Sequence, residues 1–264
     1  MQTIRKVGQI LNLFTVEEPE WGVSEVAVAL GLPKSSVSAM MSSLADQGIL
    51  KRTGERRYRL GWRIMAMSRV LLETTRFRDE ARRGMEHLAS TFGETVHLAA
   101  LERGQVIYVD KVEGRRAIRV VVTAVGGKFY AHASGVGKAL LAYRPWEEVV
   151  EILEKEGMPK LTSNTITTLE EFREELELVR KRGYAHDNEE ATPELCCVAA
   201  PIRDYTGEVV ASMSLSVPAY RFWESEEKYR NALMATVCQV SRNLGYGSKY
   251  YRASRKATKE VVSG

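Results

Sequence analysis

The stretch from Gly22 to Leu60 reads GVSEVAVALGLPKSSVSAMMSSLADQGILKRTGERRYRL, and it decides the fold of the first part of the chain. Two short segments with the apolar spacing of helices flank the turn Gly31-Leu32-Pro33. Glycine suits the turn after the first helix, and proline is tolerated at the start of the second. Ser24 is predicted to cap the first helix, and the second is predicted from about Lys34 to Gln47. The pattern predicts a helix-turn-helix.

The surface of this predicted unit suits DNA. The outer face of the second helix carries small hydroxyl and basic side chains, and a predicted hairpin around Thr53-Gly54-Glu55 carries five basic ones, Lys51, Arg52, Arg56, Arg57 and Arg59. A helix-turn-helix followed by a basic hairpin is typical of a winged DNA-binding domain, although a helical packing unit with a solvated basic loop is the alternative. The predicted DNA contacts are Ser24, Lys34, Ser35, Ser36, Ser38, Ser42, Arg52, Arg56, Arg57 and Tyr58.

The charge distribution agrees with a DNA contact near the start of the chain. The chain has 264 residues, 44% hydrophobic and 27% charged, which is ordinary for a soluble globular protein of one large or two smaller domains. The net charge of +4 divides into +3 for residues 1–75, −3 for residues 76–247 and +4 for residues 248–264. The positive charge therefore lies with the predicted DNA-binding unit and with a basic tail.

The cysteines and the apolar runs indicate a cytoplasmic protein. Three cysteines, two of them adjacent, predict no disulfide framework, and zinc-finger spacing is absent: Cys196, Cys197 and Cys238. No metal or other cofactor is predicted, and a reducing cytoplasm fits this cysteine usage. No apolar run approaches the roughly 18 residues of a membrane span, and signal-peptide features are absent from the N-terminal residues.

Two more helices are predicted around the helix-turn-helix. Thr3–Phe14 has apolar residues at helical spacing and should pack behind it. Trp62–Leu72 is rich in Met and Leu, so it is either a core helix or a connector that pairs with the same helix of a second copy. Thr74-Thr75-Arg76 is the predicted domain boundary.

The rest of the chain predicts an α+β domain with an antiparallel sheet. Helices are predicted over 77–92, 135–143, 146–156 and 225–244, with a further helix opened by the capping box of Thr168 and Glu171 and closed by Gly183. An antiparallel sheet flanked by these helices is typical of a GAF- or PAS-like sensor, in which a sheet holds a small ligand against helices. About five strands of period two are predicted, over Thr95–Leu101, Val106–Val112, Ile118–Thr123, Cys197–Ile202 and Val209–Val217.

The segment Gly135-Val136-Gly137-Lys138 invites comparison with a phosphate-binding loop. A Walker loop requires glycine and Ser/Thr where this chain has His132 and Ala139, so nucleotide binding is disfavoured. Ser134 also lacks the flanking glycines of a hydrolase nucleophile elbow. Backbone N–H groups at the start of the predicted helix suit a carboxylate instead.

The residues alone leave other groups open. The alternating Ser212, Ser214 and Ser216 share one face of a predicted strand, which either lines a ligand pocket or faces solvent. Asp187, Cys197 and His132 could converge on a metal, but no motif requires it. All four histidines lack metal-ligand spacing and are interpreted as structural: His87, His97, His132 and His186.

From about Ile4 to Tyr246 the chain resembles the IclR family of bacterial transcriptional regulators. Two stretches match the start of the recognition helix and the end of the wing, and the others match the effector domain in order. The matching stretches are Leu32–Val37, Tyr58–Gly61, Glu94–Leu98, His132–Ala142, Arg182–Ala185, Glu189-Glu190 and Cys197–Ile202. Two departures are Ala39, where the family often has arginine, and Glu194, where a small residue is common.

The resemblance implies four segments and a ligand site. The four segments are a winged helix-turn-helix over 1–61, a linker helix over 62–75, a GAF-like effector-binding domain over 76–247 and a basic tail over 248–264. It also implies homodimers or tetramers on a palindromic operator and a small carboxylic acid as effector. The implied effector contacts are Ile118, Val121, Gly135, Val136, Asp187, Leu195, Cys197, Ser214 and Ser216.

The expected function is a ligand-responsive transcriptional regulator, taken first as a repressor and not as an enzyme. One rival is a thiol-based enzyme using Cys196 or Cys197, which lacks a visibly placed general base. Another is an architectural DNA-binding protein whose sensor domain is empty. Turnover assays with thiol titration address the first rival, and ligand-dependent thermal shifts address the second.

Overall fold

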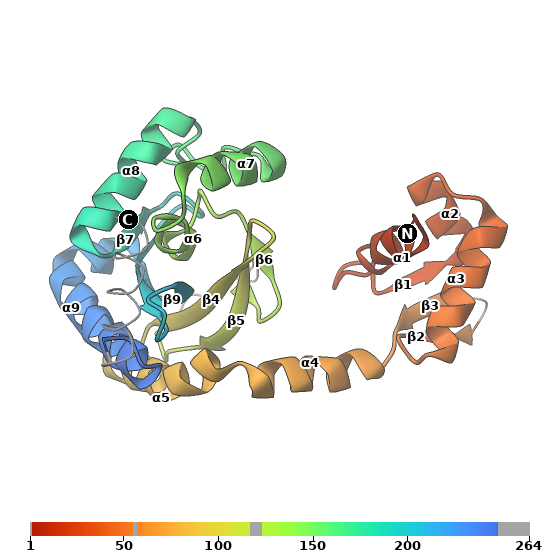
Figure 1. The fold of residues 1–264 in the computed structure, drawn as a ribbon, viewed down its shortest axis with the longest axis horizontal. Coiled ribbons are helices and arrows are strands. Elements are labelled where there is room, and N and C mark those ends of the chain that lie inside the picture. The colour runs from red at the N-terminus through yellow and green to blue at the C-terminus, as the bar shows by residue number, and fades with distance from the viewer. Residues whose placement is uncertain (1, 55–56, 117–122, 248–264) are drawn as a thin grey trace, which may run out of the picture. The chain divides into compact units, whose positions relative to one another are not determined.

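The computed structural model describes residues 2–54, 57–116 and 123–247, and it divides into two compact units, Met1–Thr74 and Thr75–Gly264 (Figure 1). The first unit contains a three-stranded antiparallel sheet in the order β1-β3-β2. Its elements are α1 (Gln2–Leu11), β1 (Glu20–Gly22), α2 (Val23–Leu30), α3 (Lys34–Asp46), β2 (Leu50–Thr53), β3 (Arg57–Leu60) and α4 (Arg63–Thr74).

The core of the first unit explains its winged helix-turn-helix form. One apolar residue from α1, one from α2 and three from α3 are buried together with Leu50 and Tyr58 of the hairpin. Gly31 ends α2 with φ of +62°, a left-handed conformation that glycine adopts without strain, and its N–H donates to the carbonyl of Ala27. The predicted helix-turn-helix and hairpin are therefore confirmed, and Glu20–Gly22 adds an edge strand.

The start of α2 differs from the prediction. Gly22 is the N-cap residue, and the Glu25 carboxylate accepts a hydrogen bond of 2.8 Å from its N–H. This bond and the Arg57 guanidinium lower the pKa of Glu25. Ser24 lies inside the helix and is exposed, so it is not the cap.

The second unit is built around a six-stranded antiparallel sheet in the order β6-β5-β4-β9-β8-β7 within its described residues. The two central strands, β4 and β9, are far apart in the sequence. The elements are α5 (Arg76–Phe92), β4 (Thr95–Glu102), β5 (Gln105–Val112), β6 (Lys128–Phe129), α6 (Gly135–Leu141), α7 (Trp146–Glu156), α8 (Leu169–Arg182), β7 (Ala185–Asn188), β8 (Leu195–Arg203), β9 (Val209–Pro218) and α9 (Ala219–Asn243).

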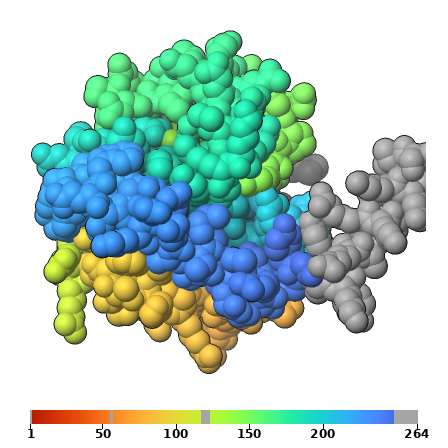
Figure 2. Space-filling view, turned by 90° about the vertical axis from the view of Figure 1, so that its left-hand side faces the viewer, coloured from red at the N-terminus to blue at the C-terminus, as the bar shows by residue number. Residues whose placement is uncertain are grey.

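Helices cover both faces of this sheet, and each face has its own core. α5 and α9 pack on the face that carries Val96, Leu98 and Met213. α6, α7 and α8 contribute to the core on the opposite face, which carries Ala99 and Ala199. Figure 2 shows α9 in blue crossing one side of the unit, with α8 above it and α5 below. The predicted α+β class is confirmed.

Several strand and helix predictions need correction. The sheet has six strands in the described residues rather than about five, because β6 and β7 are short and polar enough to lack the period-two signal. Most of the predicted strand Ile118–Thr123 lies outside the described residues. The final helix begins at Ala219, and non-helical dihedral angles at Ser225 mark a break six residues in, where the predicted helix started.

Candidate functional site

The first unit exposes the side chains predicted to contact DNA on α3. Lys34, Ser35, Ser36 and Ser38 are exposed on this helix, while Val37, Met41 and Leu44 are buried beneath them. Ala39 is exposed in the same stretch. The helix therefore presents a polar face carrying one cation and small hydroxyls, which is able to enter a major groove.

The hairpin beside α3 divides its basic residues between two roles. Lys51, Arg52 and Arg59 are exposed, and Arg52 donates a 2.6 Å hydrogen bond to Ser42 Oγ of α3 while lying over the Tyr58 ring. Arg57 is committed within the unit, since its guanidinium lies 2.7 Å from Glu25 Oε1 and donates to the Glu20 carbonyl. Arg52 joins the wing to the helix, and Arg57 joins β3 to β1 and α2.

Two predicted DNA contacts have partners inside the first unit, and one cannot be placed. The Tyr58 side chain is buried in the core, so its contribution is to packing beneath the wing. Arg57 forms ion pairs within the unit, at 2.7 Å with Glu25 and 4.0 Å with Glu20, and its side chain remains 40% exposed. Arg56 lies outside the described residues. Lys51 and Arg59, which face each other across β2 and β3, are the better candidates for phosphate contacts.

The second unit contains a partly enclosed cavity between the sheet and α6. In this cavity the described residues bring together seven of the nine predicted effector contacts, and Ile118 and Val121 lie outside those residues. The cavity also has lining residues that the sequence analysis did not assign to it. Its lining is His97, Tyr108, Thr123, Phe129, Ser134, Gly135, Val136, Asp187, Ala191, Thr192, Leu195, Cys197, Ser214 and Ser216.

Strand register explains why residues so far apart in sequence share this cavity. Asp187 pairs with Cys197 across β7 and β8, and Cys197 pairs with Ser216 across β8 and β9. Ser214 pairs with His97 of β4 in the neighbouring row. Because paired residues point to the same face of an antiparallel sheet, these polar groups form two adjacent rows beneath α6.

A β-bulge between β4 and β5 brings Tyr108 to the same face of the sheet as these polar groups. The register between β4 and β5 shifts at Leu98/Ala99, so that Tyr108 pairs with Ala99 while Asp110 pairs with Leu98 on the other face. Asp110 there accepts from Arg82 of α5 at 2.9 Å. A bulge next to a site re-aims side chains, and here it turns the Tyr108 ring toward the cavity.

The glycines of the predicted anion-binding segment serve close packing. A Cβ on Gly137 would lie 2.2 Å from the carbonyl oxygen of Ala131, and a Cβ on Gly135 would lie 3.2 Å from the Ala199 side chain. Ser134 caps α6 by accepting from the Gly137 N–H and donates to the Tyr130 carbonyl. The start of α6 therefore lies directly on the sheet, where the first N–H groups of the helix have no intrahelical acceptor.

Most titratable groups of the cavity are neutral near pH 7. Burial and the Lys111 charge lower the pKa of His97 to about 3, and burial raises the pKa of the Cys197 thiol well above its ordinary value. Burial, with the nearby Cys197 and Asp187, raises the pKa of Tyr108. Asp187 differs, because burial and the Glu190 charge raise its pKa only to about 7.

The same electrostatics disfavour thiol chemistry and a metal site. Burial and the Asp187 charge raise the pKa of Cys196 to about 11, so both adjacent thiols are protonated at neutral pH and are weak nucleophiles. His132 lies beside the Pro159 carbonyl and does not line the cavity. In the part of the chain that the structure describes, no group of three His, Cys, Asp or Glu side chains is placed to hold a metal ion.

The cavity is small in this structure. Its volume is about 30 Å³, which is the space of about one water molecule. The walls of the cavity must therefore move before an acid with one ring can bind there. Glu194 does not narrow it, since this residue is exposed and outside the lining.

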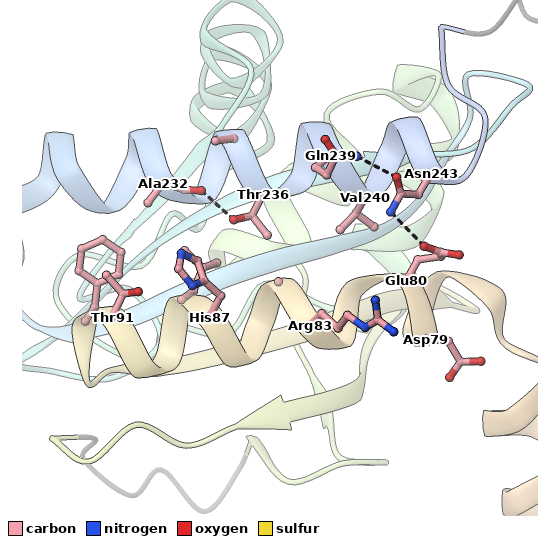
Figure 3. Close-up of a pocket in the computed structure, with 14 residues that line it drawn as sticks. Asp79, Glu80, Arg83, His87, Thr91, Ala232, Thr236, Gln239, Val240 and Asn243 are labelled. Atoms are coloured by element: carbon pink, nitrogen blue, oxygen red, sulfur yellow. Dashed lines mark hydrogen bonds between the residues drawn. The ribbon is translucent and has the colours of Figure 1, made fainter.

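A larger hollow lies on the outer surface between α5 and α9, with a volume of about 700 Å³ (Figure 3). Three of its polar side chains hydrogen-bond to one another. Gln239 donates to Asn243, and Asn243 donates to Glu80. This hollow is an open surface groove, whereas the inner cavity is lined by a buried polar atom without a partner, His97 Nε2, so the inner cavity is the better ligand site.

Comparisons with known proteins match this architecture. The family model of the bacterial transcriptional regulator IclR C-terminal domain matches residues 70–242, and the IclR helix-turn-helix model matches residues 3–54. The HTH-type transcriptional regulator KdgR of Dickeya chrysanthemi is 31% identical over 91% of this chain and 81% of its own length.

Two solved structures agree along the chain. The Thermotoga maritima IclR structure is 34% identical and covers 93% of this chain and 100% of its own, with a TM-score of 0.71. An IclR homolog from Microbacterium hydrocarbonoxydans, solved in complex with 4-hydroxybenzoate, is 26% identical over 92% of this chain and 98% of its own, with a TM-score of 0.78.

Proposed function

The chain belongs to the IclR family of DNA-binding transcriptional regulators, and from this premise we propose that it is a repressor of a palindromic operator, controlled by a small organic acid. The observation that carries the proposal is the inner cavity, to which five strands and the start of α6 contribute polar groups. The relatives named above are regulators and not enzymes, and the protonated thiols agree with this.

The proposed acid fits the chemistry of the cavity. Its carboxylate would lie at the first N–H groups of α6, beside the Ser214 hydroxyl, and its apolar part would lie against Val136 and Leu195. The related structure in complex with 4-hydroxybenzoate supports an acid of this class. Because the cavity is nearly closed here, the acid would favour an opened arrangement, and regulation would follow from its different affinity for the two arrangements.

The proposed DNA complex requires two copies of the chain. A palindromic operator is two-fold symmetric and is matched by a two-fold protein, with half-sites about one helical turn or a multiple of it apart. Selection of bound duplexes from a random pool tests this directly. Recovered sites that are inverted repeats with such spacing support the proposal, and single half-sites contradict it. Transcription from the selected operator should be low and should rise when the acid is added.

α4 is the proposed dimer helix. Its described residues include no buried one, and large apolar side chains on it or next to it are 57% to 72% exposed within one chain: Trp62, Met65, Met67, Val70 and Leu71. A patch of this kind marks an interaction site. We propose that α4 pairs with α4 of a second copy to form a homodimer, and that dimers can associate into tetramers.

Met67→Lys is expected to weaken the dimer, because it places a charge in the proposed apolar interface. Sedimentation velocity at micromolar concentration should show a smaller species than wild type, and operator affinity should fall with it. Arg69→Lys, at an exposed i,i+4 pair with Glu73, is the matched control. A wild-type protein that sediments as a monomer would contradict the assignment.

The salt dependence of DNA binding tests whether the wing contacts phosphates. Lys51→Gln with Arg59→Gln should weaken binding to all sequences and make the slope of log affinity against log salt less negative by about one unit per lost contact. Arg173→Gln with Lys181→Gln removes two exposed cations from the second unit and should leave the slope unchanged. An unchanged slope in the wing variant would remove these two residues from the interface.

The hydroxyl of Ser214 is expected to bind the acid directly. Ser214→Ala should weaken acid binding about tenfold, the low end for a hydrogen bond to a charged group, because water can replace part of it. Ser212→Ala is the control on the same strand, since its hydroxyl donates to the Ala200 carbonyl and is outside the cavity lining. Calorimetry with 4-hydroxybenzoate and pyruvate, beside an operator gel shift that should not change, measures the effect.

The placement in the cytoplasm is also a proposal. All three cysteines are free, as suits a reducing compartment. Among the described helices none combines the length and the apolar character that crossing a membrane requires.

A further inference from the structure

We propose that His97 selects the effector by presenting its Nε2–H group to a hydrogen-bond-accepting oxygen on the acid, in addition to the carboxylate. The proposal rests on the effector-binding function proposed above. It assigns a ligand-contacting role to a residue that is not among the effector contacts implied by the family resemblance. The chemical class that follows is a carboxylic acid with a second acceptor oxygen, such as an oxo or hydroxyl group.

The first observation is an unpartnered nitrogen. The His97 side chain lines the cavity and is only 3% exposed, and its Nε2 has no hydrogen-bond partner among the described residues. A buried polar atom without a partner is costly and rare in folded proteins, so it calls for an explanation. A ligand oxygen in the adjoining cavity supplies one.

The second observation favours one location for the imidazole proton. Ser216 Oγ lies 3.2 Å from His97 Nδ1 and 3.1 Å from the Cys197 sulfur. The Cys197 thiol keeps its proton, because burial raises its pKa, so it can donate to Ser216. The imidazole nitrogen is a better acceptor than sulfur, which favours the arrangement in which the Ser216 hydroxyl donates to Nδ1. With Nδ1 as acceptor, a neutral ring carries its proton on Nε2.

The third observation is that the ring is neutral and held in place. Burial and the Lys111 charge keep the His97 pKa near 3, so the ring offers one directed N–H rather than a positive charge. The Tyr108 ring lies against it with centroids 5.2 Å apart. A neutral donor discriminates by hydrogen bonding, and a site that must pair a buried donor rejects analogues without the acceptor.

The same hydrogen-bond chain revises the role of Ser216. Its hydroxyl is engaged by both Cys197 and His97, so it orients the imidazole instead of binding the acid directly. Ser214, which also lines the cavity, keeps the direct contact.

The first test needs no ligand. Long-range nitrogen–proton correlation spectra of the full chain with ¹⁵N-labelled histidine should show His97 as the neutral Nε2–H form at pH 7, assigned by its loss in His97→Gln. An Nδ1–H form or an imidazolium would overturn the proposal while leaving the effector function intact.

The second test measures selectivity. Calorimetry compares pyruvate with propionate and 4-hydroxybenzoate with benzoate on wild type, His97→Gln and His97→Leu, each checked for cooperative thermal unfolding. Wild type should prefer the oxygen-bearing acid of at least one pair by about tenfold, the worth of one hydrogen bond. Glutamine, which can place an N–H near the same point, should keep most of this preference, and leucine should abolish it.

The outcomes separate the two proposals. Wild-type binding of an acid pair with a preference that survives in His97→Leu overturns the role of His97 alone. If none of the four acids binds wild type, the proposed acid class fails, and the role of His97 fails with it.

Discussion

Replacing Lys138 by methionine is expected to destabilise the second unit by about 3–5 kcal/mol, the usual cost of removing one partner of a buried ion pair. Lys138 is only 1% exposed, although it lies on the helix that covers the cavity. Its Nζ lies 2.6 Å from Glu190 Oε1 and 3.5 Å from Glu175 Oε1. The substitution leaves the buried Glu190 carboxylate without a cation.

The location of this pair also connects stability to ligand binding. Lys138 follows the residues of α6 that line the cavity, and Glu190 precedes Ala191 and Thr192 on its other side. Glu190 also accepts from the Asn188 N–H, and its own N–H donates to Asp187. The ion pair therefore holds two walls of the cavity together, and Lys138→Met should weaken acid binding as well as folding.

Urea unfolding followed by circular dichroism measures the loss, with the transition of the second unit fitted separately. Arg173→Met, which breaks an exposed pair with Glu177, should cost less than about 1 kcal/mol. Lys138→Met combined with Glu190→Gln should be more stable than Lys138→Met alone, because it carries no unpaired buried charge. Equal stability of the Lys138 and Arg173 variants would show that the buried pair contributes nothing beyond a surface contact.

The parts of the fold that could be predicted from the sequence are those with a local signal. The apolar spacing of α3, the turn at Gly31 and the capping box that begins α8 each depend on residues within one or two turns. The alternation in β4 and β9 likewise indicates which side chains share a face. Such signals place the helix-turn-helix and the main strands, although the ends of elements shift by a few residues.

The unpredicted parts depend on contacts between distant residues. Lys138 and Glu190 are 52 positions apart, and nothing near either of them indicates a buried pair. The acidic stretch from Asp187 onward has the composition of a solvated loop, yet its first residues form β7 because Asp187 pairs with Cys197. Arg57 has the appearance of a free wing cation, and only the fold shows that Glu20 and Glu25 hold it.

His97 was within reach of sequence reasoning. It alternates with Thr95 and Ala99 on β4, so a pairing of this strand with the serine strand would have placed it beside Ser214. The missing information was strand order, since β4 and β9 are separated by more than 100 residues and the chain between them forms four other strands in the described residues. Tyr108 was out of reach, because its direction depends on a bulge.

Binding of a carboxylic acid is expected to weaken as the pH rises above 7, by up to about tenfold per pH unit, because Asp187 then ionises inside the cavity. Burial and the Glu190 charge raise the pKa of Asp187 to about 7. Below that pH it is a neutral carboxyl group that can donate a hydrogen bond. Above it, a negative charge lies close to the start of α6, where a Cβ on Gly135 would be 3.7 Å from the Asp187 Cβ.

Asp187 can be identified as the group responsible. The effector carboxylate, with a pKa near 3 to 4, stays ionised across this range. Among the cavity residues that the structure describes, the pKa of His97 is lowered to about 3, and those of Cys197 and Tyr108 are raised. None of these three groups titrates between pH 6 and pH 8, so a one-proton dependence there reports Asp187.

Calorimetry of the acid that binds wild type, repeated from pH 6 to pH 9, measures this dependence. The dissociation constant should be flat below pH 7 and rise about 100-fold by pH 9, with uptake of one proton on binding at high pH. Asp187→Asn, which cannot ionise, should bind with nearly constant affinity over the range. Because folded Asp187 keeps its proton between about pH 4 and 7 while the unfolded chain loses it, wild-type stability should also fall with rising pH across that window, and the asparagine variant should lack this loss. An affinity that stays constant in wild type would mean that the acid's carboxylate binds away from Asp187, and the proposed position at the start of α6 would be wrong.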